Sequence, residues 1–150
     1  MLWGDKNMIN EIKHNNTLLA IVIPSTYHRA GISFLTSDEL SQQLAYMEHP
    51  KGHEIAAHVH NPVHRSVVYT RETLIIRKGK LQVDFYDDDK NYIESHIIEA
   101  GDVILLVSGG HGFKVLEDIE MIEVKQGPYA GEGDKTRFPS VSEDKIVMRE

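Results

Sequence analysis

The chain has 150 residues, of which 41% are hydrophobic, and a formal net charge of −7 at pH 7. This length suits one domain with one core, and this hydrophobic content excludes a wholly disordered chain. The acidic balance argues against a general nucleic-acid or anionic-membrane binder, because such partners select a basic surface. The absence of cysteine excludes disulfides, thiolate nucleophiles and cysteine metal ligands, and it fits a reducing cytoplasm.

The N-terminal residues 1–16 are polar and carry only scattered apolar side chains. They lack the hydrophobic centre of a signal peptide, and no run in the chain approaches the roughly 18–20 apolar residues of a membrane helix. We therefore expect a poorly packed arm over residues 1–16, in a cytoplasmic protein with no membrane partner.

Short apolar and alternating runs follow the arm at roughly 8–12-residue spacing, which is typical of an all-β sandwich or barrel. We expect strands at residues 18–23, 31–35, 44–48, 54–60, 67–77, 80–86, 92–98, 102–107, 112–116 and 120–125. Turn residues separate several of them, including Lys78-Gly79 and the acidic stretch 87–91, which we interpret as a solvated turn rather than a calcium loop. Thr36 and Glu39 resemble a helix capping box, but we favour a turn followed by a strand there.

The polar residues 128–150 are expected to form a surface tail with about one helical turn, packed over the strands. No linker or repeat marks a second domain. The sequence therefore predicts a single domain over residues 1–150.

Two histidines, His58 and His60, lie one residue apart in the expected strand 54–60. In a strand, residues i and i+2 face the same side, about 6.6–6.8 Å apart along the chain. Two imidazoles at that spacing can bind one ion, with metal–nitrogen bonds of about 2.0–2.1 Å. An isolated pair of this kind is more often two surface or core histidines, so the pattern alone is weak evidence.

The carboxylate of Glu72 is the next candidate ligand. By the period of a strand, Glu72 shares a face with Leu74 and Ile76. A carboxylate on an apolar inward face is costly unless it is paired or binds a metal. A partner such as Arg65 or Arg71, or an outward-facing register, would remove the need for a metal.

His111 is the third candidate position. It follows the expected buried strand 102–107 and the turn 108–110. The alternative is a loop histidine that makes only local hydrogen bonds.

Together these segments resemble the cupin superfamily. The first cupin motif is a Gly, five residues, H-x-H, a short spacer, Glu, six residues and Gly. Here Gly52 is followed after five residues by His58 and His60, and Glu72 is followed after six residues by Gly79. The spacer between the two halves has eleven residues, whereas the family pattern has three or four.

The second cupin motif is a Gly, five residues, P-x-G-x-x-H and then Asn. Gly101 is followed after five residues by the stretch 107–111, which ends at His111. Val107 stands in place of the motif Pro, His111 arrives one residue early, and Val115 stands where the Asn would fall.

The resemblance covers about residues 31–127 and implies a double-stranded β-helix, a small barrel of two antiparallel sheets. It also implies one divalent metal held by His58, His60, Glu72 and His111. Nitrogen and oxygen ligands without sulfur fit Fe, Mn, Co, Ni, Cu or Zn. Such a ligand set leaves coordination positions open, as a catalytic metal requires.

The leading functional hypothesis is a small metalloenzyme, an isomerase or a dioxygenase, that acts on a small polar substrate such as a sugar derivative or an organic acid. The alternative is a non-catalytic ligand-binding or sensor module, because cupins serve in both ways, and a third hypothesis is a structural barrel without metal. Apolar residues on both faces of strands such as 67–77 predict a homodimer.

Several polar residues are candidates to line the cavity. His64 could substitute for a metal ligand or carry a proton, and Arg65, Arg71 or Lys125 could hold an anionic group of a substrate. On the last strand, Glu123 and Lys125 either face the cavity as a polar pair or face solvent while Ile122 and Val124 fill the core, and the second arrangement is the simpler one.

Overall fold

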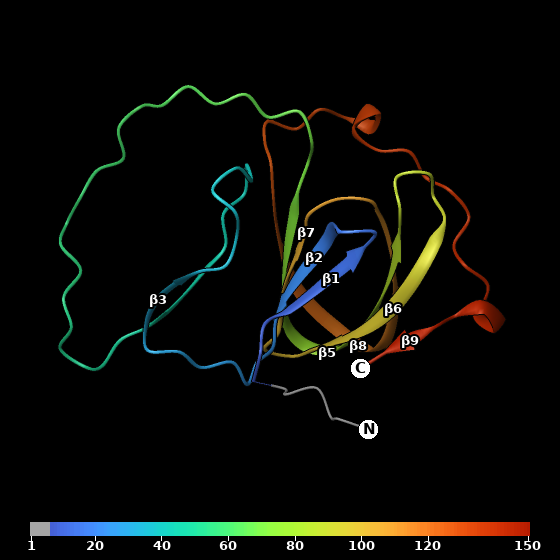
Figure 1. Ribbon diagram of the computed structural model, residues 1–150, viewed down its shortest axis with the longest axis horizontal. Helices are drawn as coiled ribbons and strands as arrows, with labels where there is room; N and C mark the ends of the chain where they lie inside the picture. The colour runs from blue at the N-terminus through green and yellow to red at the C-terminus, as the bar shows by residue number, and fades with distance from the viewer. Residues whose placement is uncertain (1–6) are drawn as a thin grey trace. The chain divides into compact units, whose positions relative to one another are not determined.

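The computed structural model describes residues 7–150, and these separate into two compact units (Figure 1). One unit combines residues 7–27 with Arg71–Glu150, and the other is the segment His28–Thr70. Regular structure in the described part is almost entirely β, with two three-residue 3₁₀ turns, so the expected all-β class is confirmed. Within residues 7–150, none of the helical segments has the length and hydrophobicity needed to cross a membrane.

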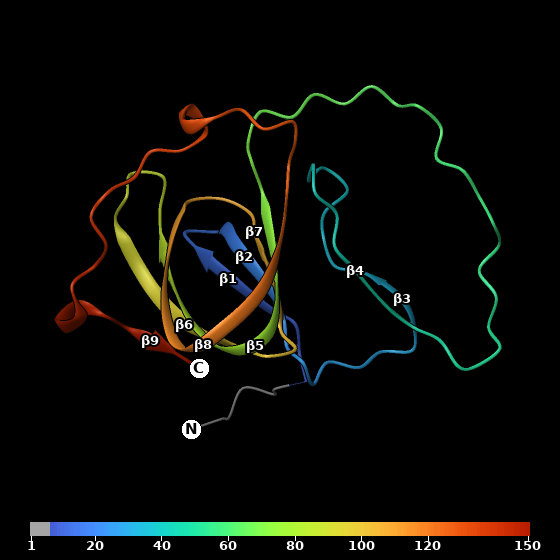
Figure 2. The same cartoon turned by 180° about the vertical axis from the view of Figure 1, so that it is seen from behind.

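The first unit is built on one curled sheet, which Figures 1 and 2 show from opposite sides. Its strands are β1 (Asn10–His14), β2 (Thr17–Ile23), β5 (Glu72–Tyr86), β6 (Tyr92–Glu99), β7 (Val103–Leu106), β8 (Gly110–Lys125) and β9 (Met148–Arg149). Their order is β1-β2-β7-β5-β6-β9, and β8 pairs along β5. The pairing is antiparallel throughout except between β6 and β9.

The strand register requires β5 to bend back on itself. Glu72, at one end of β5, lies opposite Leu106, and Tyr86, at the other end, lies opposite Gly110. Leu106 and Gly110 are four positions apart in the chain, so the two ends of β5 lie within about 25 Å of each other. A straight strand of 15 residues would span about 48 Å. The curl therefore follows from the pairing itself.

The bend is centred on Gly79. Its φ is 85°, a left-handed conformation that glycine adopts readily, and the register of β5 against β8 shifts on both sides of it. A Cβ atom at this position would lie 2.1 Å from the backbone oxygen of Asp118 on β8. The backbone of β8 therefore crosses β5 so closely that only a glycine fits.

The core of this unit lies on the inside of the curl. Side chains at alternate positions of β5, among them Leu81, Val83 and Phe85, are at most 1% exposed. They pack against inward-facing residues of β1, β2, β6 and β7: Ile12, Leu19, Ala20, Val22, Ile98, Ile104 and Leu106.

Strand β8 presents its odd-numbered residues near the C-terminal end to the same inner face. Residues directly opposite each other in an antiparallel pair share a face, and Glu123 lies opposite the buried Leu74, while Lys125 lies opposite Glu72. Ile122 and Val124 face outward and are 46% and 49% exposed. The expectation that Ile122 and Val124 fill the core is wrong, because the register with β5 places Glu123 and Lys125 on the inner face instead.

The expected strands at 18–23, 92–98 and 102–107 are confirmed to within about one residue at each end, and residues 80–86 form the second half of β5. Residues 112–116 and 120–125 join into the single strand β8, and Lys78-Gly79 is a bend inside β5 rather than a turn that ends a strand. The turn at 87–91 is confirmed.

The expectation of a poorly packed arm is wrong for residues 10–14. They form β1, and Ile12 is only 2% exposed because its side chain joins the core. Residues 1–6 of the expected arm lie outside the described residues.

The C-terminal segment packs on the sheet as expected for a tail. The ring of Phe138 meets that of Tyr86 edge-on at 4.9 Å, and the backbone N–H of Val141 donates to the Tyr86 hydroxyl at 2.9 Å. The segment contains two short turns, η1 (Glu132–Asp134) and η2 (Glu143–Lys145), and ends in β9 beside β6.

The second unit contains one hairpin, formed by β3 (Gly31–Phe34) and β4 (Ala45–Glu48). The Thr36 hydroxyl donates to the Gln43 side chain and accepts from the backbone N–H of Leu44, so a turn followed by a strand is confirmed and a helix is not formed. The expected strand at residues 54–60 is wrong. This stretch is exposed and lies in no strand, and an extended chain becomes a strand only where a neighbour pairs with its backbone.

Candidate functional site

Two of the sequence-predicted ligands meet on the first unit. The Nε2 atom of His111 lies 3.1 Å from an Oε2 atom of Glu72, and the two side chains are 29% and 15% exposed. Glu72 is the first residue of β5, whereas His111 lies beside the last residues of β5, opposite Phe85. The curl of the sheet therefore brings together two side chains from opposite ends of the same strand pair. We refer to these two residues as the Glu72–His111 pair.

The surroundings of Glu72 favour its charged form. The hydrogen bond with His111 is the largest cause that lowers the pKa of the Glu72 carboxyl, and the positive charges of Lys125 and Lys135 act in the same direction. Partial burial opposes this effect without overcoming it. Glu72 is therefore a carboxylate at neutral pH, held half-buried at the inner face of the sheet.

Lys125 accompanies the pair from the facing strand. It lies directly opposite Glu72 in the β5–β8 register, and its Nζ atom is 3.3 Å from an Oε1 atom of Glu123. Glu123 is the main cause, and Glu72 a further one, of a raised pKa of the Lys125 ammonium. The inner face thus carries one fixed cation next to the paired carboxylate.

An apolar surface continues from His111 along the inner face of β8. The ring centroid of Phe113 lies 5.2 Å from that of His111, and Phe113 and Val115 are opposite the buried Val83 and Leu81. Phe113 and Val115 are nonetheless 41% and 53% exposed. The core side of β8 is therefore accessible next to the pair.

The other two predicted ligands lie in the second unit. His58 and His60 are exposed, and their rings stand edge to face with centroids 5.2 Å apart. The Nδ1 atom of His58 is 2.9 Å from the carbonyl oxygen of Ala56, so an Nδ1–H donates there and leaves Nε2 as the basic nitrogen. His64 and Arg65, predicted to act on the substrate, are exposed in the same extended segment.

The four predicted ligands are thus present as two pairs, each in its own unit. Among residues 7–150, no three or more His, Asp or Glu side chains are gathered closely enough to hold one metal ion. The four-ligand metal site stays a prediction.

For Lys125, the sequence left open whether the side chain faces the cavity or solvent, and the simpler arrangement, in which it faces solvent, is wrong. The period of two along 121–125 does put Glu123 and Lys125 on one face, but the pattern cannot say which face is inside. Only the pairing of Lys125 with Glu72 and of Glu123 with Leu74 decides this.

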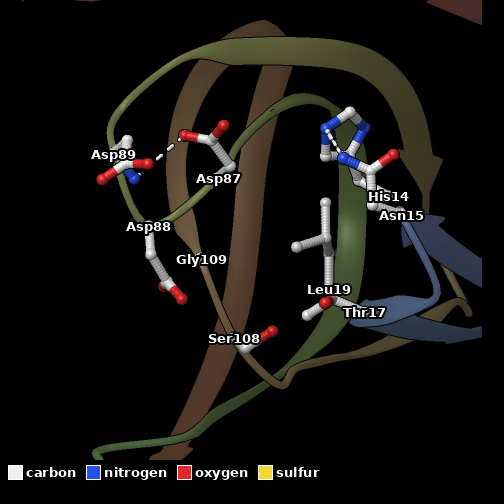
Figure 3. Close-up of a pocket in the computed structure, with 9 residues that line it drawn as sticks. All are labelled: His14, Asn15, Thr17, Leu19, Asp87, Asp88, Asp89, Ser108 and Gly109. Carbon is white, nitrogen blue, oxygen red and sulfur yellow. Dashed lines mark hydrogen bonds between the residues drawn. The ribbon is translucent and has the colours of Figure 1, made fainter.

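A separate cavity of about 220 Å³ lies at the turns that follow β1 and β5 (Figure 3). It is lined by His14, Asn15, Thr17, Leu19, Asp87, Asp88, Asp89, Ser108 and Gly109. The Asp87 carboxylate accepts hydrogen bonds from the backbone N–H groups of Asp89 and Asn91 and from the Asn91 side chain. These bonds lower the Asp87 pKa and use its oxygens to hold the turn, in agreement with a solvated turn rather than a calcium loop.

Comparison of the chain with known proteins gave no matching family model, no matching curated protein and no matching solved structure. What the protein does is therefore inferred from its own side chains and their contacts.

Proposed function

We propose that the protein is a metal-binding cupin with a double-stranded β-helix fold, in which Glu72 and His111 provide two ligands of one divalent ion and His58 and His60 provide the other two. The observation that carries the proposal is the contact between Glu72 and His111. These residues come from the two halves of the cupin-like sequence pattern and are far apart in the chain, yet they meet on the inner face of a curled sheet.

The donor atoms suit a transition metal. Glu72 offers a carboxylate held in its charged form, and His111 offers a ring nitrogen beside it. The Nδ1–H of His58 donates a hydrogen bond to the backbone carbonyl oxygen of Ala56, as metal-binding histidines commonly do, so its Nε2 atom is the one that would bind the ion. Nitrogen and oxygen donors without sulfur fit Fe, Mn, Co, Ni, Cu or Zn.

We propose further that the site acts on a small polar molecule, a sugar derivative or an organic acid, by isomerisation or oxygenation. A bound metal would supply Lewis-acid polarisation of a substrate oxygen. The chain itself would bind and orient the substrate, with Arg65 holding an anionic group and His64 carrying a proton. The chemistry of these side chains supports their assignment, since guanidinium pairs with carboxylates and imidazole titrates near neutral pH.

A homodimer in the cytoplasm completes the proposal. Ile75 on β5 and Ile122 on β8 lie opposite each other on the outer face and are 37% and 46% exposed, and Val124 beside them is 49% exposed. A second copy that covered this apolar strip would remove it from water. Light scattering of the purified protein at micromolar concentration would contradict the dimer if it gave the mass of one chain.

Elemental analysis of the untagged protein tests the metal site. We expect about one transition-metal ion per chain in the wild type and its loss in Glu72→Gln and in the double variant His58→Ala/His60→Ala. His28→Ala is the matched control, because this histidine is exposed and pairs only weakly with Glu48 at 3.4 Å.

Wild-type protein without stoichiometric metal would contradict the metal site. Full turnover by metal-free protein on a panel of sugar derivatives and organic acids would contradict its catalytic role. A small molecule that raises the melting temperature without ever being converted would instead support a ligand-binding or sensor protein.

A further inference from the structure

We propose that residues 65–69, here called the arm, pair as a strand with β8 of a second copy of the chain, along the edge of β8 that faces away from β5. We call this edge the far edge of β8. The inference rests on the proposed homodimer, for which it names the contact, and it requires no metal. It is carried by the exposure of the arm and of the far edge, by their charges and by the length of chain between them.

The far edge of β8 is open to another strand. Within residues 7–150, β8 pairs along β5, and no backbone hydrogen bond joins its far edge to the rest of the described chain. Alternate residues of an antiparallel strand point their N–H and C=O groups to the far edge, and β8 has 16 residues. Residues 120–125 are exposed throughout and include the apolar Met121, Ile122 and Val124. A long exposed edge with apolar side chains is a template for strand pairing.

The arm has the residues of a strand but is exposed. Val67, Val68 and Tyr69 are β-branched or aromatic, which favours a strand, yet they are 45%, 83% and 72% exposed. The arm lies in no strand, and its backbone makes no backbone hydrogen bond within residues 7–150. Three consecutive apolar residues that remain in water indicate a binding surface.

The charges of the arm and of the far edge are complementary. Arg65 gives the arm one positive charge, and the arm contains no acidic residue. Residues 120–125 contain Glu120, Glu123 and Lys125, which leaves one net negative charge. Opposite charges favour the pairing of the arm with this edge, whereas two β8 edges, both negative, would repel each other.

The arm of the same chain is tied too closely to β5 to pair with the far edge. Glu72 on β5 lies directly opposite Lys125 on β8, so a strand on the far edge would lie two strand spacings, about 9.4–9.8 Å, from β5. Only Thr70 and Arg71 separate Tyr69 from Glu72, and three fully extended steps of the chain span at most about 11 Å. This span leaves no residue for the turns on either side of β8. The arm that pairs with the far edge therefore comes from a second copy.

The exchange of arms closes at two copies. Each arm precedes Glu72, beside the last residue of its own β8, so an arm that extends past this end can reach a second copy placed there. A two-fold axis brings the second arm back to the first copy in the same way. Ile122 and Val124, at the edge that receives the arm, belong to the apolar strip of the proposed homodimer. The arm would extend this strip by one strand.

Proline substitutions in the arm test the contact. Successive residues of a strand bond to opposite edges, so the pairing needs the N–H of either Val67 or Val68, and proline removes it. At least one of Val67→Pro and Val68→Pro should weaken the dimer by about tenfold or more in sedimentation of a dilution series. Val63→Pro is the matched control, because Val63 is 60% exposed in the same extended segment but lies outside the arm, and it should change the affinity less than about threefold. Circular dichroism checks that each variant is folded.

Hydrogen exchange locates the contact on β8. The amides of residues 120–125 should exchange more slowly in the wild-type dimer than in diluted monomer, and this protection should be lost in the weakened variant. Equal dimer affinity of the wild type and both arm variants, or unchanged exchange on dimerisation, would overturn the inference and leave the homodimer with the apolar strip alone. A monomer with protected residues 120–125 would also overturn it, because the edge would then be closed within one chain.

A wild-type protein that stays monomeric with these amides unprotected would overturn the proposed homodimer together with this inference. Elemental analysis of the same samples judges the metal site separately. Failure of the arm contact, of the homodimer and of the metal site can thus be distinguished.

Discussion

Replacement of Gly79 by alanine should strongly destabilise the first unit. Two costs add at this position. An alanine held at φ 85° is strained by about 1–2 kcal/mol relative to an ordinary backbone angle. Its Cβ would also lie 2.1 Å from the backbone oxygen of Asp118, so one of the two strands must move. Overpacking of this kind costs about 1–3 kcal/mol, which gives a total loss of about 2–5 kcal/mol in the free energy of unfolding.

Gly131→Ala separates the two costs. Gly131 has a φ of 80°, but a Cβ there would meet no atom within 4 Å. The Gly131→Ala variant should therefore lose only the free energy that the strained backbone angle costs. Urea unfolding followed by far-ultraviolet circular dichroism measures both variants against the wild type, and a larger loss of stability in Gly79→Ala than in Gly131→Ala reports the contact with Asp118.

The result also tests the origin of the site. Because the bend at Gly79 lets β5 return on itself, the substitution should weaken the approach of Glu72 to His111 and lower metal content. If Gly79→Ala unfolds at the same urea concentration as Gly131→Ala, with the same slope, the close crossing of β5 and β8 is not a determinant of the fold and the reasoning fails.

Three further predictions follow from burial, hydrogen bonding and charge. In metal-free protein, the lowered pKa of Glu72 contributes stability that is fully present above the ordinary glutamate pKa of about 4.3 and is lost as the pH falls through the lower folded-state pKa. The difference in the free energy of unfolding between wild type and Glu72→Gln should therefore shrink as the pH falls below about 4.3, and a constant difference would show that His111 does not stabilise the carboxylate. Leu81→Ala removes part of a side chain that is 0% exposed and should lower the free energy of unfolding, measured by thermal unfolding, by about 2–5 kcal/mol. Ile122→Ala, on the outer face, should lower it by less than about 1 kcal/mol, and equal losses would contradict the assignment of the inner face. Tyr86→Phe removes the hydroxyl that accepts a hydrogen bond from the backbone N–H of Val141. The variant should lose about 0.5–1.5 kcal/mol in the free energy of unfolding, and protease should cleave its C-terminal segment faster. An unchanged cleavage rate would show that this hydrogen bond does not hold the segment on the sheet.

Local patterns in the sequence predicted much of the curled sheet. The strands at 80–86, 92–98 and 102–107 follow from alternating or continuous apolar residues bounded by turn residues, and a side-chain period of two is a property of each strand alone. The same period correctly placed Glu72 on the face of Leu74 and Ile76, which are both 1% exposed. Residue type and spacing were sufficient to predict these strands and the face of Glu72, because both depend on neighbours along the chain and not on distant residues.

The errors lie where a partner strand decides the outcome. Residues 10–14 are polar in sequence, but pairing with β2 makes them a strand and buries Ile12. Residues 54–60 have strand-like alternation but no strand beside them. Along 121–125 both faces carry apolar or long side chains, so the period was visible while the choice of face was not.

The sequence by itself determined the class of fold, the turn chemistry and the kinds of side chain available for a site. Tertiary structure alone decided that Glu72 meets His111 and that Lys125 stands opposite Glu72. The physical reason is that a strand pattern describes one chain segment at a time. A contact between the two ends of a strand pair depends on how far that pair bends, and here the bend is set by strand register and by the close crossing at Gly79.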